Sequence, residues 1–263
     1  MTILKRNLTA SLACLLALAA PLQGKDWTRL RVAIEAGYPP FNTLSPDKQI
    51  GGFDKDIADA VCAQIQARCT FVIQDWDGMV PGLLARRYDT IISSMAPTDE
   101  RRRRIAFTRP YYVEPIQFIA RRGGALDVDH PAAMKGKRIG VQSATIFENY
   151  VKGVYQPAGA LPVVYQSLEQ VYLDLVAGRL DAVLVGKPEN DAFLQSADGA
   201  AFVPAGRLLY DAKWFGVGAA IAVRREDQDL RRALDDAIVA IHKDGRYDAI
   251  RRKYFSYDIW PGE

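Results

Sequence analysis

The sequence of 263 residues predicts an α/β protein with two lobes, each a β-sheet with helices on its faces. Short apolar runs alternate with amphipathic stretches in the first part of the chain, which is the order of a parallel sheet with crossover helices. The same order returns in the second part. Between them, residues 107–120 carry prolines and apolar residues without helical spacing, which indicates an extended crossing.

Up to residue 92, the first lobe is expected to contain three strands and two helices. The strands are predicted at residues 31–34, 69–73 and 90–92, and the helices at residues 53–65 and 79–85. The third strand is bounded by Asp89 and by two serines, and its short apolar run suits a buried central position. Pro97 ends this segment, because proline has no amide hydrogen to donate to a sheet.

The residues after Pro97 begin a helix that places an arginine near its positive end. Thr98 is expected as the N-cap, and two acids follow it. Arg101 then lies at about the third helical position, where the helix dipole disfavours a cation. A guanidinium beside free amide hydrogens suits a carboxylate held by two parallel hydrogen bonds. The alternative is a solvated basic face, since three more arginines follow directly.

The second lobe repeats the order of strands and helices. Strands are predicted at residues 137–141, 163–165 and 181–185, and helices at residues 146–151 and 168–177. The chain then extends after Pro204, forms a strand at residues 219–223 and ends in helices at residues 230–241 and 247–255. The predicted division gives residues 25–113 and 211–263 to the first lobe and residues 114–210 to the second, with a cleft at the strand ends.

The first 24 residues predict a cleaved signal peptide. Lys5 and Arg6 precede a short apolar core, and small residues follow it. The core is too short for a membrane-spanning helix. Cys14 is a weak candidate for a lipid anchor, because Ser11 stands where such signals usually have leucine. Without these two basic residues the remaining charges almost balance, so no nucleic-acid partner is expected.

Cys62 and Cys69 are the two cysteines outside this segment. In an exported protein two cysteines allow one disulfide pairing. Metal binding is the weaker interpretation, because His130 and His242 lie far away and in no ligand spacing. No metal and no cofactor are expected.

Several motifs together resemble a known family. They are YPPF at 38–41, GGFDKDIA at 51–58, DWDGMVPGL at 75–83, YDTIISSM at 88–95, TDER at 98–101, GRLDAVL at 178–184 and DGRYDAIRRKYF at 244–255. Over residues 30–260 the chain resembles the periplasmic substrate-binding proteins for polar amino acids, in the lysine/arginine/ornithine-, histidine- and opine-binding group. The resemblance implies a type II periplasmic binding protein whose two crossing strands form a hinge. It also implies a monomer in the periplasm, a small-molecule ligand, an inner-membrane ABC permease as partner, and no enzymatic activity.

The resemblance also implies which residues bind the ligand. Arg101 would hold the α-carboxylate, with help from amide hydrogens near Ser143 and Thr145. Ser93 and Ser94 would offer a hydroxyl and a carbonyl to an ammonium group or to the ligand side chain.

Three further positions are implied at the walls of the cleft. Tyr38 and Trp76 would enclose the aliphatic or planar part of the ligand, although both could be ordinary core aromatics. Glu35 would meet a distal positive charge, and its alternative is a solvated loop acid. Asp54 is a second candidate acid that could equally cap its own helix.

Two departures from the family pattern bear on the ligand. Ala96 stands where a hydroxyl usually supports the carboxylate, and Gly186, followed by Lys187, stands where an aspartate usually pairs with the α-ammonium group. A buried ammonium without an anion would cost several kcal/mol. The ligand is therefore expected to be a cationic amino acid or, slightly favoured, an N-substituted derivative such as an opine.

Two other functions remain as alternatives. The same fold hosts a periplasmic cyclohexadienyl (arogenate/prephenate) dehydratase, in which a glutamate past the second-lobe strand is the general acid, and Glu189 is close to that place. Pro188 before it favours the start of a surface helix instead. An exported partner of a membrane sensor kinase would share the same ligand chemistry.

Overall fold

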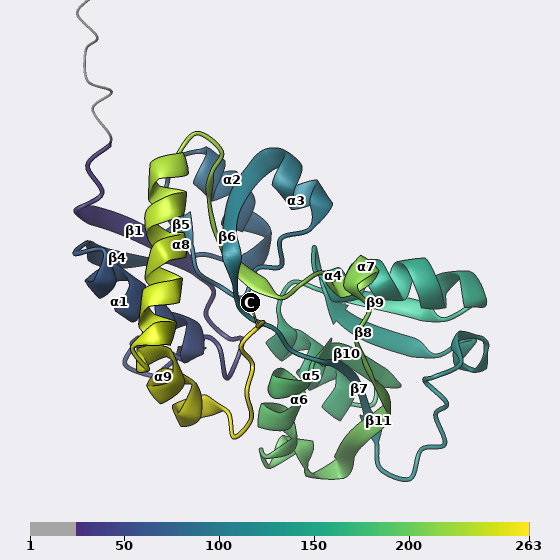
Figure 1. Ribbon diagram of the computed structural model, residues 1–263. Coiled ribbons are helices and arrows are strands. Elements are labelled where there is room, and N and C mark those ends of the chain that lie inside the picture. Colours follow the sequence, from purple (N-terminus) through teal and green to yellow (C-terminus); the bar gives the residue numbers. More distant parts are fainter. Residues whose placement is uncertain (1–24, 263) are drawn as a thin grey trace, which may run out of the picture.

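The computed structural model describes residues 25–262 and has a mixed α/β fold with two five-stranded sheets. Figure 1 shows the two sheets in separate lobes that lie side by side, with the C-terminal end of the chain between them. The predicted signal peptide and Cys14 lie outside the described residues. Within residues 25–262, no helix combines the length and the apolar character needed to cross a membrane.

The sheet of the first lobe has the order β4-β1-β5-β12-β6. Its strands are β1 (Arg29–Ile34), β4 (Arg68–Ile73), β5 (Thr90–Ile91), β6 (Ile105–Tyr112) and β12 (Ala219–Arg224). β1 pairs in parallel with β4 and β5, as the sequence predicts, whereas β12 pairs antiparallel with β5 and β6. The sheet is therefore mixed, because its fourth strand returns from the other lobe.

The helices of the first lobe come from both ends of the chain. They are α1 (Phe53–Gln64), α2 (Met79–Leu84), α3 (Asp99–Arg104), α8 (Gln228–Lys243) and α9 (Arg246–Tyr254). A short hairpin of β2 (Thr43–Leu44) and β3 (Ile50–Gly51) precedes α1. α1 packs against α8 and α9, so the C-terminal helices complete the lobe that the N-terminal half begins.

The sheet of the second lobe has the order β11-β7-β10-β8-β9. Its strands are β7 (Ile116–Arg121), β8 (Arg138–Gln142), β9 (Leu161–Tyr165), β10 (Ala182–Gly186) and β11 (Phe202–Leu209). The helices are α4 (Ile146–Tyr150), which continues into a π-helical turn η3 (Val151–Tyr155), α5 (Leu168–Val176) and α6 (Lys187–Leu194). β8 pairs in parallel with β9 and β10, and β7 pairs antiparallel with β10 and β11.

Two segments carry the chain between the sheets. Val113 to Pro115 join β6 to β7, and a segment with the short helix α7 (Ala212–Phe215) joins β11 to β12. The C-terminal tail lies along the first crossing, where the Val113 amide donates to the Ile259 carbonyl at 2.8 Å.

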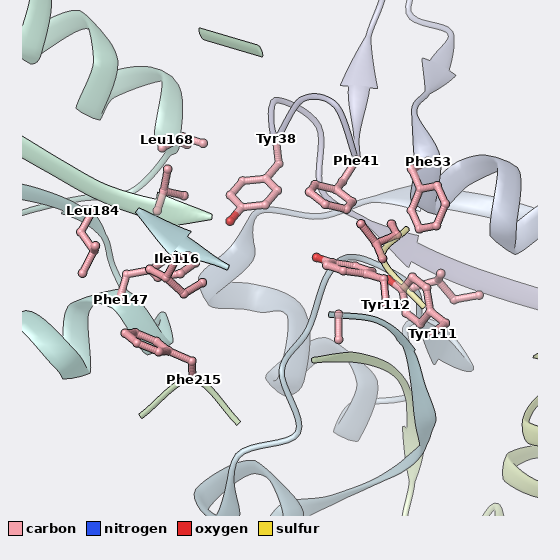
Figure 2. Packing of buried hydrophobic residues seen from close by; sticks show 14 of the residues in the cluster. Tyr38, Phe41, Phe53, Tyr111, Tyr112, Ile116, Phe147, Leu168, Leu184 and Phe215 are labelled. Carbon is pink, nitrogen blue, oxygen red and sulfur yellow. The ribbon is translucent and has the colours of Figure 1, made fainter. Parts of the chain in front are cut away.

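Aromatic side chains fill the part of the core next to the crossings (Figure 2). Phe41 stacks on Tyr112 with ring centroids 4.5 Å apart, and Phe53 meets Phe255 edge to face at 5.3 Å. Gly52 allows this packing. Its φ of 107° suits glycine, and a Cβ there would collide with the Phe41 carbonyl.

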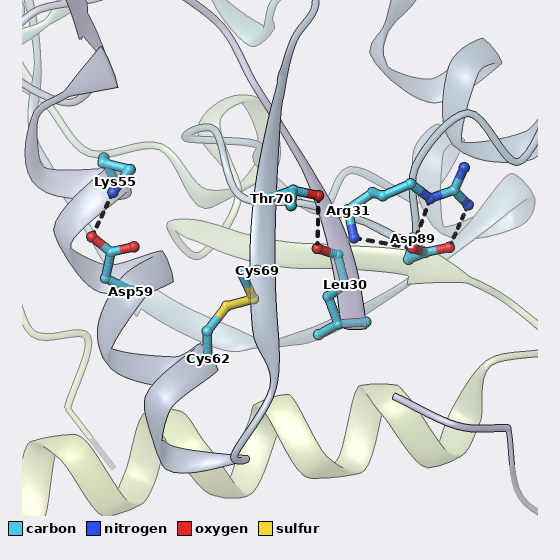
Figure 3. The surroundings of a disulfide bond; sticks show 8 residues. All are labelled: Leu30, Arg31, Lys55, Asp59, Cys62, Cys69, Thr70 and Asp89. Atoms are coloured by element: carbon cyan, nitrogen blue, oxygen red, sulfur yellow. Dashed lines mark hydrogen bonds and ion pairs between the residues drawn. A yellow bond between two sulfur atoms is a disulfide. The ribbon is translucent and has the colours of Figure 1, made fainter. Parts of the chain in front are cut away.

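The predicted disulfide between Cys62 and Cys69 is confirmed. Figure 3 shows that it joins the end of α1 to the beginning of β4. It therefore closes the connection between these two elements at the start of the strand.

Candidate functional site

A cavity of about 170 Å³ lies between the two lobes and takes side chains from both. This volume exceeds many times what a single water molecule needs, which leaves room for a small solute. Of the predicted site residues, the ones that line it are Glu35, Tyr38, Trp76, Ser93, Ser94, Arg101 and Thr145. Ser143 is not among its lining residues.

Glu35 lies directly after β1 and is almost fully buried, with 7% of its surface exposed. Its amide donates to Oγ of Ser93 at 2.9 Å, and its Oε1 accepts a hydrogen bond of 2.7 Å from Nε2 of Gln142 in the second lobe. Burial raises the pKa of Glu35 to about 7, and the nearby Asp75 and Asp77 add to this effect. The predicted loop acid is thus a buried carboxyl that faces the other lobe.

Asp54 has a supporting role in the structure. It is fully buried in the first turn of α1, and it accepts hydrogen bonds of 2.7 Å from Ser94 and Tyr111 and of 2.9 Å from Asn42. Burial raises its pKa to about 6. The hydroxyl of Ser94 is therefore occupied by Asp54, and this contact holds the loop after β5.

Arg101 lies in the first turns of α3, and Thr98 caps this helix as predicted, with its hydroxyl accepting from the Arg101 amide at 3.3 Å. The guanidinium donates to the carbonyls of Ala96 and Ala144, each at 2.8 Å. It also lies over the Trp76 ring, with Cζ 5.1 Å from the ring centroid.

Burial lowers the pKa of Arg101 to about 10, which still leaves the side chain charged at neutral pH. Within residues 25–262 it forms no ion pair with a carboxylate. The next three arginines of α3 are exposed, so the basic face and the cavity-lining guanidinium are separate features of the same helix.

The loop after β8 brings the second lobe to the same place. Ala144 has a φ of 54°, unusual for a residue other than glycine, and its carbonyl accepts from Arg101 and from Nε1 of Trp76 at 3.2 Å. Thr145 caps α4 by accepting from the Glu148 amide at 3.2 Å. Ser143 lies at the contact between the lobes, where its hydroxyl donates to Asp77 at 2.9 Å.

The second lobe and the segment that joins β11 to β12 also supply apolar walls that the sequence did not reveal as such. Ile116, Phe147, Leu209 and Phe215 line the cavity. Such walls suit a stretch of methylene groups between polar ends, since apolar atoms leave water when they contact them.

Two further acids, Glu114 and Glu189, lie close together near the site, and the first of them was not predicted. Glu114 lies in the crossing segment and lines the cavity. Glu189 lies in the first turn of α6, as expected, but it is only 1% exposed, so the prediction of a surface position is wrong. The sequence signal for Glu114 is an acid between apolar residues and a proline in an otherwise apolar crossing.

Comparison with known proteins gives a family match. Residues 30–257 match the family described as bacterial extracellular solute-binding proteins, family 3. The L-arginine-binding protein of Pseudomonas aeruginosa is 42% identical over 232 residues, which are 88% of this chain and 89% of that protein.

Two further proteins match this chain over a similar share of its length. The lysine/arginine/ornithine-binding periplasmic protein of Escherichia coli is 33% identical over 88% of this chain and 89% of its own length. A solved structure of an ancestral arginine-binding protein bound to arginine superposes with a TM-score of 0.80 at 29% identity, and the match covers 87% of this chain and 99% of that one.

Proposed function

Because the chain belongs to the bacterial extracellular solute-binding proteins, family 3, we propose that it is the solute-binding component of an ABC importer. Its ligand would be a cationic amino acid or an opine-like derivative. The names of the two relatives described above state that they bind arginine, lysine or ornithine, which are amino acids with basic side chains. This supports the proposed ligand class.

The observation that carries the proposal is the charge pattern of the cavity. Arg101 is the one basic residue among the described side chains that line it, and it has no carboxylate partner there. Glu35, Glu114 and Asp211 line the same cavity. One cation and several acids around apolar walls match a solute that carries one carboxylate and an excess of positive charge.

In the proposed binding mode, Arg101 holds the ligand carboxylate in two parallel hydrogen bonds. Glu35 faces the distal cation, and the rings of Tyr38 and Trp76 enclose the chain between the two charged ends. Ser93, Thr145 and the carbonyl of Ser94 border the polar end. Water leaves the cavity as the lobes close, which strengthens the charged contacts.

Closure of the lobes would follow ligand capture. The bonds of Arg101, Trp76 and Gln142 across the cleft join the lobes, and the two crossing segments would act as the hinge.

The division into residues 25–113 with 211–263 and residues 114–210 is part of this proposal. So are removal of residues 1–24 as a signal peptide, location in the periplasm, a monomeric state and recognition of the closed form by an inner-membrane permease.

Calorimetric titration tests the ligand class. Purified protein, unfolded and refolded to remove any bound solute, is titrated with arginine, lysine, ornithine, histidine, octopine, glutamine and glutamate. Tight binding of at least one cationic compound, and weak or no binding of glutamate, is expected. Binding of only neutral or acidic compounds would overturn the proposal.

The burial of Glu189 favours one other candidate function. Burial raises its pKa to about 7, a value suited to a general acid near neutral pH. A dehydratase would convert prephenate to phenylpyruvate, which absorbs in the ultraviolet. Turnover by the wild type that is lost in Glu189→Gln would support the enzyme, whereas no turnover leaves the binding function.

A further inference from the structure

Two acids with enclosed carboxylate oxygens have no charge partner among the described residues, and one of them, Glu114, lines the cavity. Glu114 lies between β6 and β7, and Glu189 lies in the first turn of α6. Oε2 of Glu114 and both carboxylate oxygens of Glu189 are enclosed and without a hydrogen-bond partner within residues 25–262. Enclosed carboxylates are costly unless a cation or a proton accompanies them.

The two carboxyl groups meet at Gly186, the last residue of β10. A Cβ built on Gly186 would overlap Oε2 of Glu189 and would lie 2.5 Å from Oε1 of Glu114. The glycine therefore makes the space that both acids occupy. Two carboxyl groups this close do not both ionise readily, and they titrate as a pair.

The surrounding groups leave this pair without a cation. Lys187 forms an ion pair with Asp191 one turn further along α6, and its ammonium group lies 5.3 Å from the Tyr257 ring centroid. The Tyr257 hydroxyl is also enclosed without a partner. Tyr38 is close enough that burial and the charges of Glu189 and Glu114 raise its pKa well above the usual range.

We propose that Glu114, which lines the cavity, and Glu189, which packs beside it at Gly186, together form the binding site for a primary ammonium group of the ligand. This inference rests on the proposed function and narrows it. Arg101 takes the carboxylate, Glu35 the distal cation, and the acid pair the amino group. A second carboxylate on that nitrogen, as in an opine, would face two acids and be repelled. The ligand class is then a basic amino acid with a free amino group.

Burial raises the pKa of Glu189 to about 7 and that of Glu114 well above its usual range, and the charge of Glu189 adds to the shift of Glu114. The pair therefore holds a proton near neutral pH. An ammonium group favours the ionised pair, so its binding releases a proton to the buffer. Asp54 adds to the negative potential at both acids.

The test compares two ligands on two proteins by calorimetry. The ligands are arginine and its analogue without the α-amino group, and the proteins are the wild type and Glu114→Gln/Glu189→Gln. On the wild type, loss of the amino group is expected to weaken binding by about 10²-fold. On the double variant, the two ligands should bind within a few-fold of each other. Asp198→Asn, at an exposed position of the second lobe, is the control and should behave as the wild type.

Proton release supplies a second readout that needs no variant. Titration of the wild type with arginine and with the analogue, in two buffers of different ionisation enthalpy near pH 7, should show that arginine releases a larger fraction of a proton per ligand, because Glu35 responds to both ligands and the acid pair to arginine alone. The inference alone is overturned if both proteins discriminate equally between the two ligands, or if the two ligands release equal fractions of a proton from the wild type. Failure of the wild type to bind any cationic amino acid overturns the proposed function as well.

Discussion

At the scale of single residues, the site depends on buried charges that lack partners of their own. Glu35 is the clearest case outside the acid pair, because its carboxyl lies at the cavity wall and, within residues 25–262, accepts a hydrogen bond from Gln142 alone. Its charged form is disfavoured by burial in the free protein. A ligand cation would remove that penalty, so Glu35 should set the preference for basic side chains.

Substitution of Glu35 tests this preference. Glu35→Gln keeps the size of the side chain and its polarity but removes the charge. Affinity for arginine should fall by about 10²-fold, while binding of glutamine should change little. Calorimetry with both ligands measures the ratio, and an unchanged preference for arginine would exclude Glu35 as the partner of the distal cation.

The raised pKa of Glu35 also predicts how stability depends on pH. Its pKa is about 7 in the folded protein, compared with 4.5 as its reference value. Because the folded protein holds this proton more tightly, Glu35 contributes fully to the free energy of unfolding below pH 4.5. This contribution, about 3 kcal/mol, is lost as the pH rises from 4.5 through the folded-state pKa of about 7. Urea unfolding of the ligand-free protein between pH 4.5 and 8 should show this decline, and Glu35→Gln should reduce it. Equal slopes in both proteins would contradict the assignment.

At the scale of elements, local sequence patterns predicted most strands and helices but not their environments. Apolar runs and the Thr98 cap identify β1, β4, β8 and α3, because these signals are local. The antiparallel pairing of β12 joins segments far apart in the chain, and no local pattern encodes it.

Glu189 was expected to be exposed, because an acid after proline is typical of a surface helix start. Its burial follows from the packing of α6 against β7 and β10.

The same limit applies to the site. Motifs predicted the cavity residues after β1, β5 and β8, since strand ends at one edge of a sheet meet. They did not reveal Gln142 as the partner of Glu35, or Asp54 as the support of Ser94, because both contacts depend on tertiary packing.

The disulfide is an element-scale feature that should affect stability without affecting binding. Cys69 lies at the start of β4, and the cavity lies beyond the other end of the neighbouring strand, roughly 15–20 Å away at about 3.3 Å per residue. Replacing Cys62 and Cys69 by serine should lower the free energy of unfolding by about 2.5 kcal/mol. Urea unfolding and calorimetry check this, and a large loss of affinity with little loss of stability would contradict it.

At the scale of the whole molecule, the predicted family and the type II fold are confirmed by the match over residues 30–257 and by the superposed structures. The lobes meet through few direct contacts. Among the predicted site residues, Ser143 is the one that does not line the cavity. Its hydroxyl instead donates a hydrogen bond to Asp77. Its role should be to stabilise the closed form rather than to touch the ligand.

Asp77→Ala should therefore weaken binding through faster dissociation. The loss of one partly exposed hydrogen bond to a charged group corresponds to about 1 kcal/mol, or roughly a fivefold increase in the dissociation rate, with little change in the association rate. Stopped-flow tryptophan fluorescence measures both rates. Ser143→Ala should have the same effect, and the double variant should add nothing more. Additive effects would show that the two side chains act separately.

The most direct test of the central claim is calorimetric titration of Arg101→Met with the tightest-binding cationic amino acid, together with a thermal unfolding curve of the same sample. Methionine preserves the apolar stem and removes the guanidinium. We expect a folded protein whose affinity falls by at least about 10²-fold. A folded variant with the affinity of the wild type would contradict the claim that Arg101 binds the ligand carboxylate in this cavity.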